Sequence, residues 1–220
     1  MQSPQATDWN RFWSKPDSQQ FGRVSWSKSR ILNILEPYAL AGKKALDAGC
    51  GSGFFSNYFC NQGMITVAAD YSDGALQMAR TLTAGKCRLL KVDFLNEQLA
   101  DKLENRFDLI FSDGLLEHFS GDEQNTIIKN WASVLSDTGV MVTFVPNRFS
   151  PWELIRPLYM PGIEETPFII KELVAVHERN GLSIIQKGGV NTIPFRFSPD
   201  RWTGSTFGML LYVVARQSRR

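Results

Sequence analysis

A glycine-rich turn between a strand-like run and a helix-like run constrains this 220-residue chain more than any other feature. The apolar run at 44–48 ends at Gly49, Gly51 and Gly53, and bulky residues then recur at helical spacing over 54–59. Glycines permit a tight strand-to-helix turn and let a ligand approach the backbone closely. The N–H groups that open the helix attract an anionic or electron-rich part of that ligand. The turn therefore predicts a site for a nucleotide-like cofactor, although a lone glycine loop is also compatible with a plain structural turn.

Acidic residues end the next two strand-like segments. The segment 65–70 ends at Asp70, where a carboxylate can accept hydrogen bonds from both hydroxyls of a ribose. The segment 87–94 ends at Asp93 and Phe94, an acid and a ring suited to the exocyclic amine and the flat face of an adenine. Because ligands bind outside the carboxyl ends of parallel strands, both acids are expected beside the glycine turn.

A fourth strand is predicted over 107–111, and it breaks into a polar loop at Ser112 and Asp113 on the same side of the sheet. We expect that loop to close the far end of the pocket. The remaining chain alternates between helical and strand-like patterns, which predicts a mainly parallel sheet with right-handed crossovers. The further elements expected are helices at 122–135 and 168–180 and strands at 140–145, 182–186 and 207–215.

These motifs resemble those of the class I S-adenosylmethionine-dependent methyltransferases of the small-molecule type. The matching residues are 46–53, Asp70, 92–94 and 107–118, which follow one another in the family's order over roughly 43–145. The resemblance implies an α/β, Rossmann-like fold with a small cap. Its mainly parallel sheet would have seven strands in the order 3-2-1-4-5-7-6, with the last strand antiparallel and helices on both faces. It also implies S-adenosyl-L-methionine as methyl donor and S-adenosyl-L-homocysteine as product.

The resemblance also implies roles for single residues. Asp47 and the glycine turn would hold the methionine end of the cofactor, Asp70 the ribose, and Asp93 with Phe94 the adenine. The loop at 112–114 would lie beside the methionine amino group and the reactive methyl. The cofactor-binding residues expected in this way are Asp47, Gly49, Cys50, Gly51, Gly53, Asp70, Tyr71, Asp93, Phe94, Ser112 and Asp113.

His118 is the candidate catalytic base, since an imidazole titrates near neutrality and the preceding loop should carry it toward the pocket mouth. Alternatively, Glu117 and His118 end the strand-to-helix loop and contact the backbone or the ribose. The other histidine, His177, falls in a predicted peripheral helix, where a structural role is expected.

Two related chemistries find little support in the sequence. Asp113 resembles one ligand of the magnesium-dependent catechol O-methyltransferases, but Asn147 stands where the second acid would be needed, so no metal site is expected. The residues at 113–116 read Asp-Gly-Leu-Leu instead of the Asn-Pro-Pro-aromatic signature of enzymes that methylate base or glutamine amines. The net charge of +2 likewise gives no electrostatic case for nucleic acid.

Two other functions remain open. A nicotinamide-dependent oxidoreductase would share the glycine turn and Asp70, but its Gly-x-Gly-x-x-Gly pattern would place the third glycine one position after Gly53. A non-catalytic cofactor-binding subunit would keep the same motifs without turnover.

One domain of 1–220 is expected, with an N-terminal helical cap or lid at 1–40 and a lid insert at 147–167. Both segments are rich in rings, which implies an apolar or aromatic small-molecule acceptor, although rings can also simply anchor a cap. Arg23, Arg148 and Arg156 are candidates to pair with an acidic group on the acceptor. The rings are Trp9, Phe12, Trp13, Phe21, Trp26, Phe149, Trp152 and Tyr159, with Met160 beside them.

The three cysteines form neither a disulfide framework nor a metal-ligand pattern, which favours a reducing, cytoplasmic location. No apolar run has the length of a signal-peptide core or of a membrane span. The sequence leaves the atom that is methylated and the oligomeric state undetermined.

Overall fold

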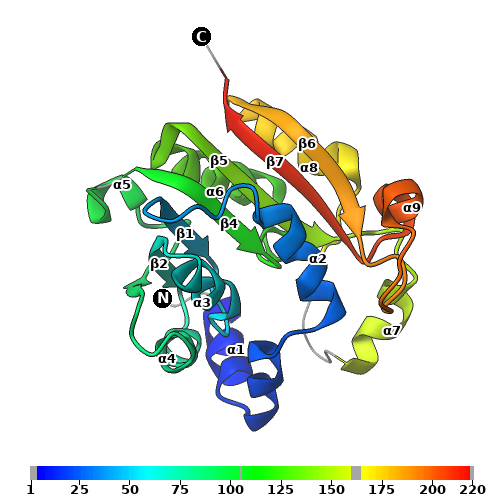
Figure 1. Cartoon of the computed structure of the whole chain (residues 1–220), viewed down its shortest axis with the longest axis horizontal. Helices are drawn as coiled ribbons and strands as arrows, with labels where there is room; N and C mark the ends of the chain where they lie inside the picture. Colours follow the sequence, from blue (N-terminus) through cyan, green and yellow to red (C-terminus); the bar gives the residue numbers. More distant parts are fainter. Residues whose placement is uncertain (1–3, 105, 160–164, 219–220) are drawn as a thin grey trace.

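The computed structural model describes residues 4–104, 106–159 and 165–218. Its centre is a seven-stranded sheet in the order β3-β2-β1-β4-β5-β7-β6 (Figure 1). The first five strands run parallel, whereas β7 is antiparallel to both of its neighbours. The strands are β1 (Lys44–Ala48), β2 (Ile65–Asp70), β3 (Arg88–Lys91), β4 (Phe107–Asp113), β5 (Leu135–Pro146), β6 (Leu182–Val190) and β7 (Leu210–Gln217). The predicted strand order and the antiparallel last strand are confirmed.

Helices cover both faces of this sheet, so its central strands are buried on both sides. Along β4, Ile110 packs into the same cluster as Trp131, on the face of α6 (Gly121–Ser133) and α8 (Ile170–Arg179). Its neighbour Phe111 points the other way, to the rings of Phe55 and Phe59. That second face is covered by α2 (Trp26–Leu35) and α3 (Phe54–Asn61). The continuous apolar run of β4 follows directly from this two-sided burial.

The remaining helices complete the layers and build the cap. Figure 1 shows α1 and α7 beyond the ends of the strands, away from the sheet itself. Several helix starts are set by side-chain caps: Ser72 accepts the N–H of Ala75, and Ser120 with Glu123 forms a capping box at α6. These helices are α1 (Pro4–Trp13), α4 (Asp73–Leu82), α5 (Leu99–Lys102), α7 (Trp152–Tyr159) and α9 (Asp200–Phe207), with 3-10 turns η1 (Pro16–Gly22) and η2 (Leu116–His118).

Several boundaries differ from the sequence prediction. The helix expected to reach residue 135 ends at Ser133, and β5 begins two residues later, so the polar stretch at 137–139 lies inside the strand. The pairing with β4 changes register there, and a Cβ on Gly139 would lie 2.6 Å from the carbonyl oxygen of Phe107. Gly139 therefore allows an irregular strand rather than a helix stop. Helices α7 and α9 also occupy stretches for which no helix was predicted.

His177 has the structural role expected of it. Its ring is fully buried, with Nε2 3.0 Å from the hydroxyl of Thr143 and Nδ1 2.8 Å from the carbonyl oxygen of Leu173. Burial lowers the pKa of His177 to about 4, which keeps the imidazole neutral in the core.

All three cysteines fall within the described part of the chain and are free thiols. Across these same residues, none of the helices has the length and apolar character needed to cross a membrane.

Candidate active site

A cavity of about 780 Å³ lies at the carboxyl ends of the parallel strands. Four acids that end or follow β1, β2, β3 and β4 line it: Asp47, Asp70, Asp93 and Asp113. Neighbouring parallel strands bring their carboxyl ends to one edge of the sheet, so these distant residues meet there. Tyr71 and Phe94 also line the cavity, beside Asp70 and Asp93.

The glycine turn forms one wall of this cavity through Gly49, Cys50 and Gly51. Gly49 and Gly51 have φ values of +78° and +48°, a region that side chains rarely adopt. The carboxylate of Asp70 accepts the N–H of Gly51 at 3.0 Å and that of Ser72 at 2.9 Å. Asp70 therefore holds the turn in shape while it faces the cavity.

Two of the expected site residues, Gly53 and Ser112, do not line the cavity. Gly53 caps α3 with φ at +76°, and a Cβ there would lie 2.5 Å from the Cα of Ala79 in α4. Its glycine is required for the close packing of two helices. Ser112 is buried within β4, and its hydroxyl has no hydrogen-bond partner among the described residues.

Buried carboxyls dominate the electrostatics of the cavity. Asp47 is 2% exposed, and burial raises its pKa to about 7, although the Ser56 hydroxyl donates to it at 2.5 Å. Burial likewise raises the pKa of Asp113 to about 6, an effect that the nearby Lys28 opposes. It also raises the pKa of Asp70. These acids favour a ligand that carries positive charge.

Lys28 is the cation that faces these acids from α2. It lines the cavity, and burial lowers its pKa to about 8 while Asp113 acts in the opposite direction. Its ammonium donates to the backbone oxygens of Phe21 and Arg23 and lies 4.2 Å from the ring centre of Phe54. A ligand carboxylate placed here would meet a positive charge.

The N-terminal rings close over the glycine turn. Trp9, Phe12, Trp13 and Phe21 all line the cavity, and the ring centres of Phe12 and Trp13 are 5.0 Å apart, edge to face. A Cβ on Gly51 would lie 2.6 Å from the ring of Trp13, so this ring rests directly on the turn.

The other candidates for acceptor contacts are divided between the cavity and the surface. Trp152 and Arg156 of α7 line the cavity, whereas Trp26, Phe149 and Arg23 are exposed and do not. Arg148 is also outside the cavity and pairs with Glu172 at 2.9 Å. Met160 and the side chain of Tyr159 lie outside what the structure describes.

His118 lies at one end of the cavity in a cluster of buried acids. Its Nε2 is 4.0 Å from Oε1 of Glu117, and its ring meets Trp9 edge to face with 4.7 Å between ring centres. Glu117 is 2% exposed, and Oε2 has no hydrogen-bond partner in the described ranges, so burial raises its pKa well above the usual range. Glu165 joins this cluster and pairs with Arg156 at 3.4 Å. Proton-accepting groups are thus concentrated at this end.

Sequence reasoning missed Lys28 and Glu165. The start of α2 offered a signal, because Ser25 is a good helix cap and its side chain accepts the N–H of Lys28, which places the lysine in the first turn. Glu165 follows no motif, and only the fold brings it to Glu117; the N–H of Thr166 donates to the Glu117 carbonyl oxygen at 2.8 Å.

Comparison with known proteins identifies relatives of this chain. A protein-family model described as a methyltransferase domain matches residues 46–143. The ubiquinone biosynthesis O-methyltransferase of Nitrobacter winogradskyi is 28% identical over 212 residues, covering 90% of this chain and 78% of that protein. The enzyme of the same name from Coxiella burnetii is 25% identical over 177 residues, covering 76% and 75%.

Solved structures share the fold at lower identity. A TehB-like SAM-dependent methyltransferase from Corynebacterium glutamicum superposes with a TM-score of 0.66 at 19% identity, covering 99% of this chain and all of that one (100%). Magnesium protoporphyrin IX methyltransferase from Synechocystis PCC 6803, solved with bound SAH, gives 0.67 at 16% identity and coverages of 98% and 95%.

The strand order and the position of the cavity define a Rossmann-like fold that binds its ligand at the carboxyl ends of the strands. With the matched domain and the relatives, this chain belongs to the class I S-adenosylmethionine-dependent methyltransferases. It is an enzyme, and S-adenosylmethionine is its methyl donor. The relatives give no support to the nicotinamide-dependent or non-catalytic alternatives.

Proposed function

We propose that this enzyme transfers a methyl group to a hydroxyl of a small apolar or aromatic molecule. The observation that carries the proposal is a cavity with the acids of a cofactor site on one side, aromatic walls from two segments, and His118 beside Glu117 at the end. Relatives named ubiquinone biosynthesis O-methyltransferase support oxygen as the methylated atom.

The charges of the cavity suit this cofactor, which carries a sulfonium, an ammonium and a carboxylate. In our proposal, Asp47 and Asp113 attract the cationic groups, and Gly49, Cys50 and Gly51 admit the methionine part. The carboxylate of that part pairs with Lys28, whose position argues for this role.

The nucleoside part occupies the neighbouring stations of the sheet edge. Asp70, with Tyr71, accepts the ribose hydroxyls, and Asp93 with Phe94 receives the adenine. Gly53 and Ser112 contribute indirectly: Gly53 keeps α3 against α4, and Ser112 belongs to the buried strand that ends at Asp113.

Catalysis then depends mainly on alignment and on excluding water. When bound, the cofactor supplies an electrophilic methyl group on a sulfonium. Trp9 and Phe12 exclude water from the cavity, and the walls hold the acceptor oxygen in line. His118 accepts the acceptor's hydroxyl proton at a ring nitrogen, and Trp9 and Glu117 fix the orientation of its ring.

The two aromatic segments act as lids in this proposal. Segment 1–40 supplies the rings over the glycine turn, and segment 147–167 supplies Trp152 and Arg156 on the opposite side. A flat apolar acceptor would fit between them. The cytoplasmic location stays a prediction that cell fractionation would test.

The test is a methylation assay with S-adenosylmethionine and a panel of phenols, amines and thiols, followed by mass spectrometry. We expect mono-methylated phenolic products and little reaction with amines. His118→Gln should lower kcat about 10²- to 10³-fold while the affinity for the cofactor stays unchanged. Methylation confined to amines, or a His118→Gln variant with full kcat, would refute the proposed acceptor chemistry or base.

A further inference from the structure

Beside the cavity, large apolar side chains stand almost fully in solvent. Leu154 and Leu158 on α7 are 84% and 81% exposed, and Phe197 and Trp202 near α9 are 80% and 82% exposed. Phe195 is 66% exposed in the same loop. We call these five residues, with Arg196 and Arg201, the aromatic-arginine surface. Exposed apolar groups gathered in this way mark an interaction site.

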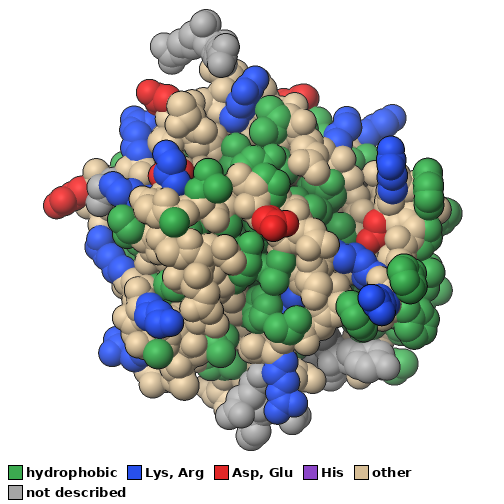
Figure 2. Space-filling model, in the orientation of Figure 1, with side chains coloured by type: hydrophobic (Ala, Val, Ile, Leu, Met, Phe, Trp, Pro, Cys, Tyr) green, Lys and Arg blue, Asp and Glu red, His purple; other side chains and the backbone are tan. Residues whose placement is uncertain are grey.

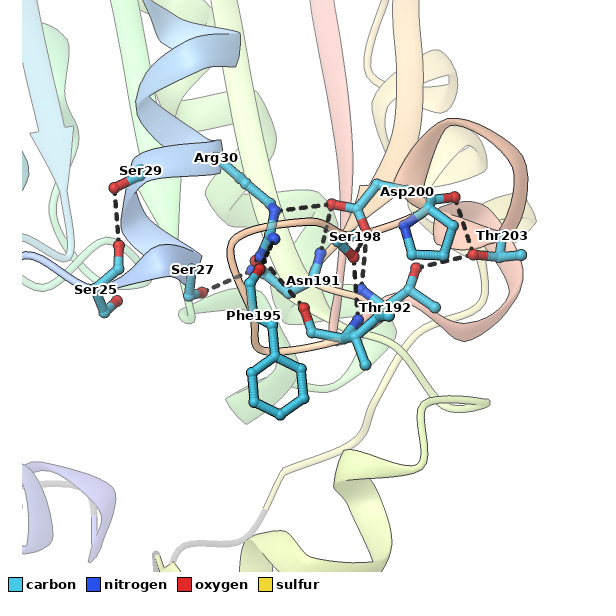
Figure 3. A network of polar contacts seen from close by, with 12 residues as sticks. Ser25, Ser27, Ser29, Arg30, Asn191, Thr192, Phe195, Ser198, Asp200 and Thr203 are labelled. Atoms are coloured by element: carbon cyan, nitrogen blue, oxygen red, sulfur yellow. Dashed lines mark hydrogen bonds and ion pairs between the residues drawn. The ribbon is translucent and has the colours of Figure 1, made fainter.

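The loop that carries these rings is firmly held by polar contacts (Figure 3). Arg30 of α2 donates to Asn191 Oδ1 at 2.8 Å and to the carbonyl oxygen of Phe195, and it pairs with Asp200 at 3.3 Å. Asp200 in turn accepts the N–H groups of Asn191 and Thr192 at 3.0 and 2.8 Å. The rings are thus presented by an ordered scaffold, since each end of the loop is bonded to it.

Both parts of the surface arise at the same edge of the sheet. Helix α7 follows the carboxyl end of β5, and the ring-bearing loop follows the carboxyl end of β6, which runs in the same direction as β5. Asn147 joins them, because its side-chain N–H groups donate to the backbone oxygens of Thr206 and Gly208 at 3.0 and 2.9 Å. Figure 1 shows α7 and α9 on one side of the molecule, and Figure 2 shows hydrophobic side chains gathered there among basic ones.

The charges of this surface are one-sided. Arg196 and Arg201 are exposed within it. The acids of the same segments are turned inward to ion pairs: Glu153 and Glu165 with Arg156, and Asp200 with Arg30. The exposed face therefore combines apolar side chains with positive charge.

We propose that the aromatic-arginine surface binds the headgroup region of an anionic lipid bilayer. Trp and Phe side chains favour the membrane interface, and arginines are attracted by anionic headgroups, each by about fivefold in binding constant. Arg196 lies over the ring of Phe197, 5.6 Å from its centre, so charge and ring would enter the interface together. The bilayer accounts for both the rings and the positive charge, whereas an apolar partner surface would account only for the rings.

The position of α7 connects this surface to the cavity. Trp152 and Arg156 line the cavity, while Leu154 and Leu158 of the same helix face solvent. A bound bilayer would thus lie against the outer side of a cavity wall, and an apolar acceptor could enter from the lipid. This last step rests on the proposed function; binding to the bilayer does not.

The test is co-sedimentation of the full chain with vesicles of phosphatidylcholine alone or with 30% phosphatidylglycerol, a composition in the range of ~30% anionic lipid that gives a clear surface potential. We expect sedimentation with the anionic vesicles, weakened by salt, and at least tenfold weaker binding by the variant Phe197→Ser/Trp202→Ser. The matched control is Leu40→Ser/Ile65→Ser, which removes two exposed apolar side chains elsewhere, Ile65 being at the amino end of β2. Thermal melting checks that both variants fold.

Equal binding to neutral and anionic vesicles, no binding, or unchanged binding by Phe197→Ser/Trp202→Ser would overturn the proposal. Self-association in size-exclusion chromatography that this variant abolishes, without vesicle binding, would assign the surface to a second copy and also overturn it. Because no acceptor or cofactor is present, failure of the proposed methyl transfer would leave this result unaffected.

Discussion

Replacement of Asp47 by Asn should stabilise the protein without its cofactor while it weakens cofactor binding. Asp47 is 2% exposed at the carboxyl end of β1, and its hydrogen bond comes from the Ser56 hydroxyl. Asn keeps the size of the side chain and an oxygen that can accept that bond. The substitution therefore removes mainly a buried negative charge.

The magnitude follows from the pKa of Asp47, which burial raises from an ordinary value of 3.8 to about 7. At about 1.4 kcal/mol per tenfold change in acidity, ionisation of this group costs the folded state roughly 4 kcal/mol. The folded state holds the proton more tightly than the unfolded state, so the cost is absent below about pH 4, grows as the pH rises, and is complete above about pH 7. Relaxation of the site reduces it, and we expect about 2–4 kcal/mol at pH 8.

The assay is urea denaturation of wild type and Asp47→Asn at pH 8 and pH 5, both without cofactor. The variant should have the larger free energy of unfolding at pH 8, and the difference should shrink by more than half at pH 5. Asp73→Asn is the control, because Asp73 is 71% exposed and should change stability by less than ~0.5 kcal/mol. In calorimetry, Asp47→Asn should bind S-adenosylmethionine about 10- to 100-fold more weakly. A variant that is less stable at pH 8, or a difference that is constant with pH, would refute the reasoning.

Three further predictions concern other parts of the site. Gly53→Ala should lower the free energy of unfolding by at least ~2 kcal/mol more than Gly85→Ala, because both glycines have positive φ but only the Cβ at 53 meets α4; equal losses in urea denaturation would contradict this. Lys28→Met should weaken S-adenosylmethionine binding about tenfold yet leave 5′-methylthioadenosine, which lacks the amino-acid carboxylate, unaffected; equal losses for both ligands would exclude the carboxylate contact. Asn130→Ala should destabilise the fold by about 2–4 kcal/mol in urea denaturation, because the buried Asn130 amide bonds the backbone of Phe94, Glu97 and Leu99; a loss below ~1 kcal/mol would show that these groups find other partners.

The sheet was predictable because its signals are local and come in a fixed order. Each apolar run ends at a turn or an acid, and the resemblance to a family then supplied the strand order, which periodicity alone does not contain. The carboxyl-end rule also brought Asp47, Asp70, Asp93 and Asp113 to one cavity, as the structure confirms.

What the sequence did not reveal depends on contacts between distant segments. Gly53 reads as part of the cofactor loop, yet its glycine is required by Ala79 in another helix. Lys28 and Glu165 reach the cavity only because α2 and the segment after α7 fold over the strand ends. The ring-bearing loop at 192–199 is held by Arg30, more than 160 residues away in the chain, as hydrogen bonds separated by 161 and 165 residues show. No local pattern encodes such pairings.

The most direct test of the central claim is calorimetric titration of the purified protein with S-adenosylmethionine and, separately, with NADH. We predict micromolar binding of S-adenosylmethionine, on the order of −8 kcal/mol, and no binding of NADH. Asp70→Ala should weaken the binding at least tenfold, because Asp70 faces the cavity and holds Gly51, whereas Asp73→Ala should leave it unchanged. Binding of NADH alone, or S-adenosylmethionine binding that Asp70→Ala leaves intact, would contradict the site described above.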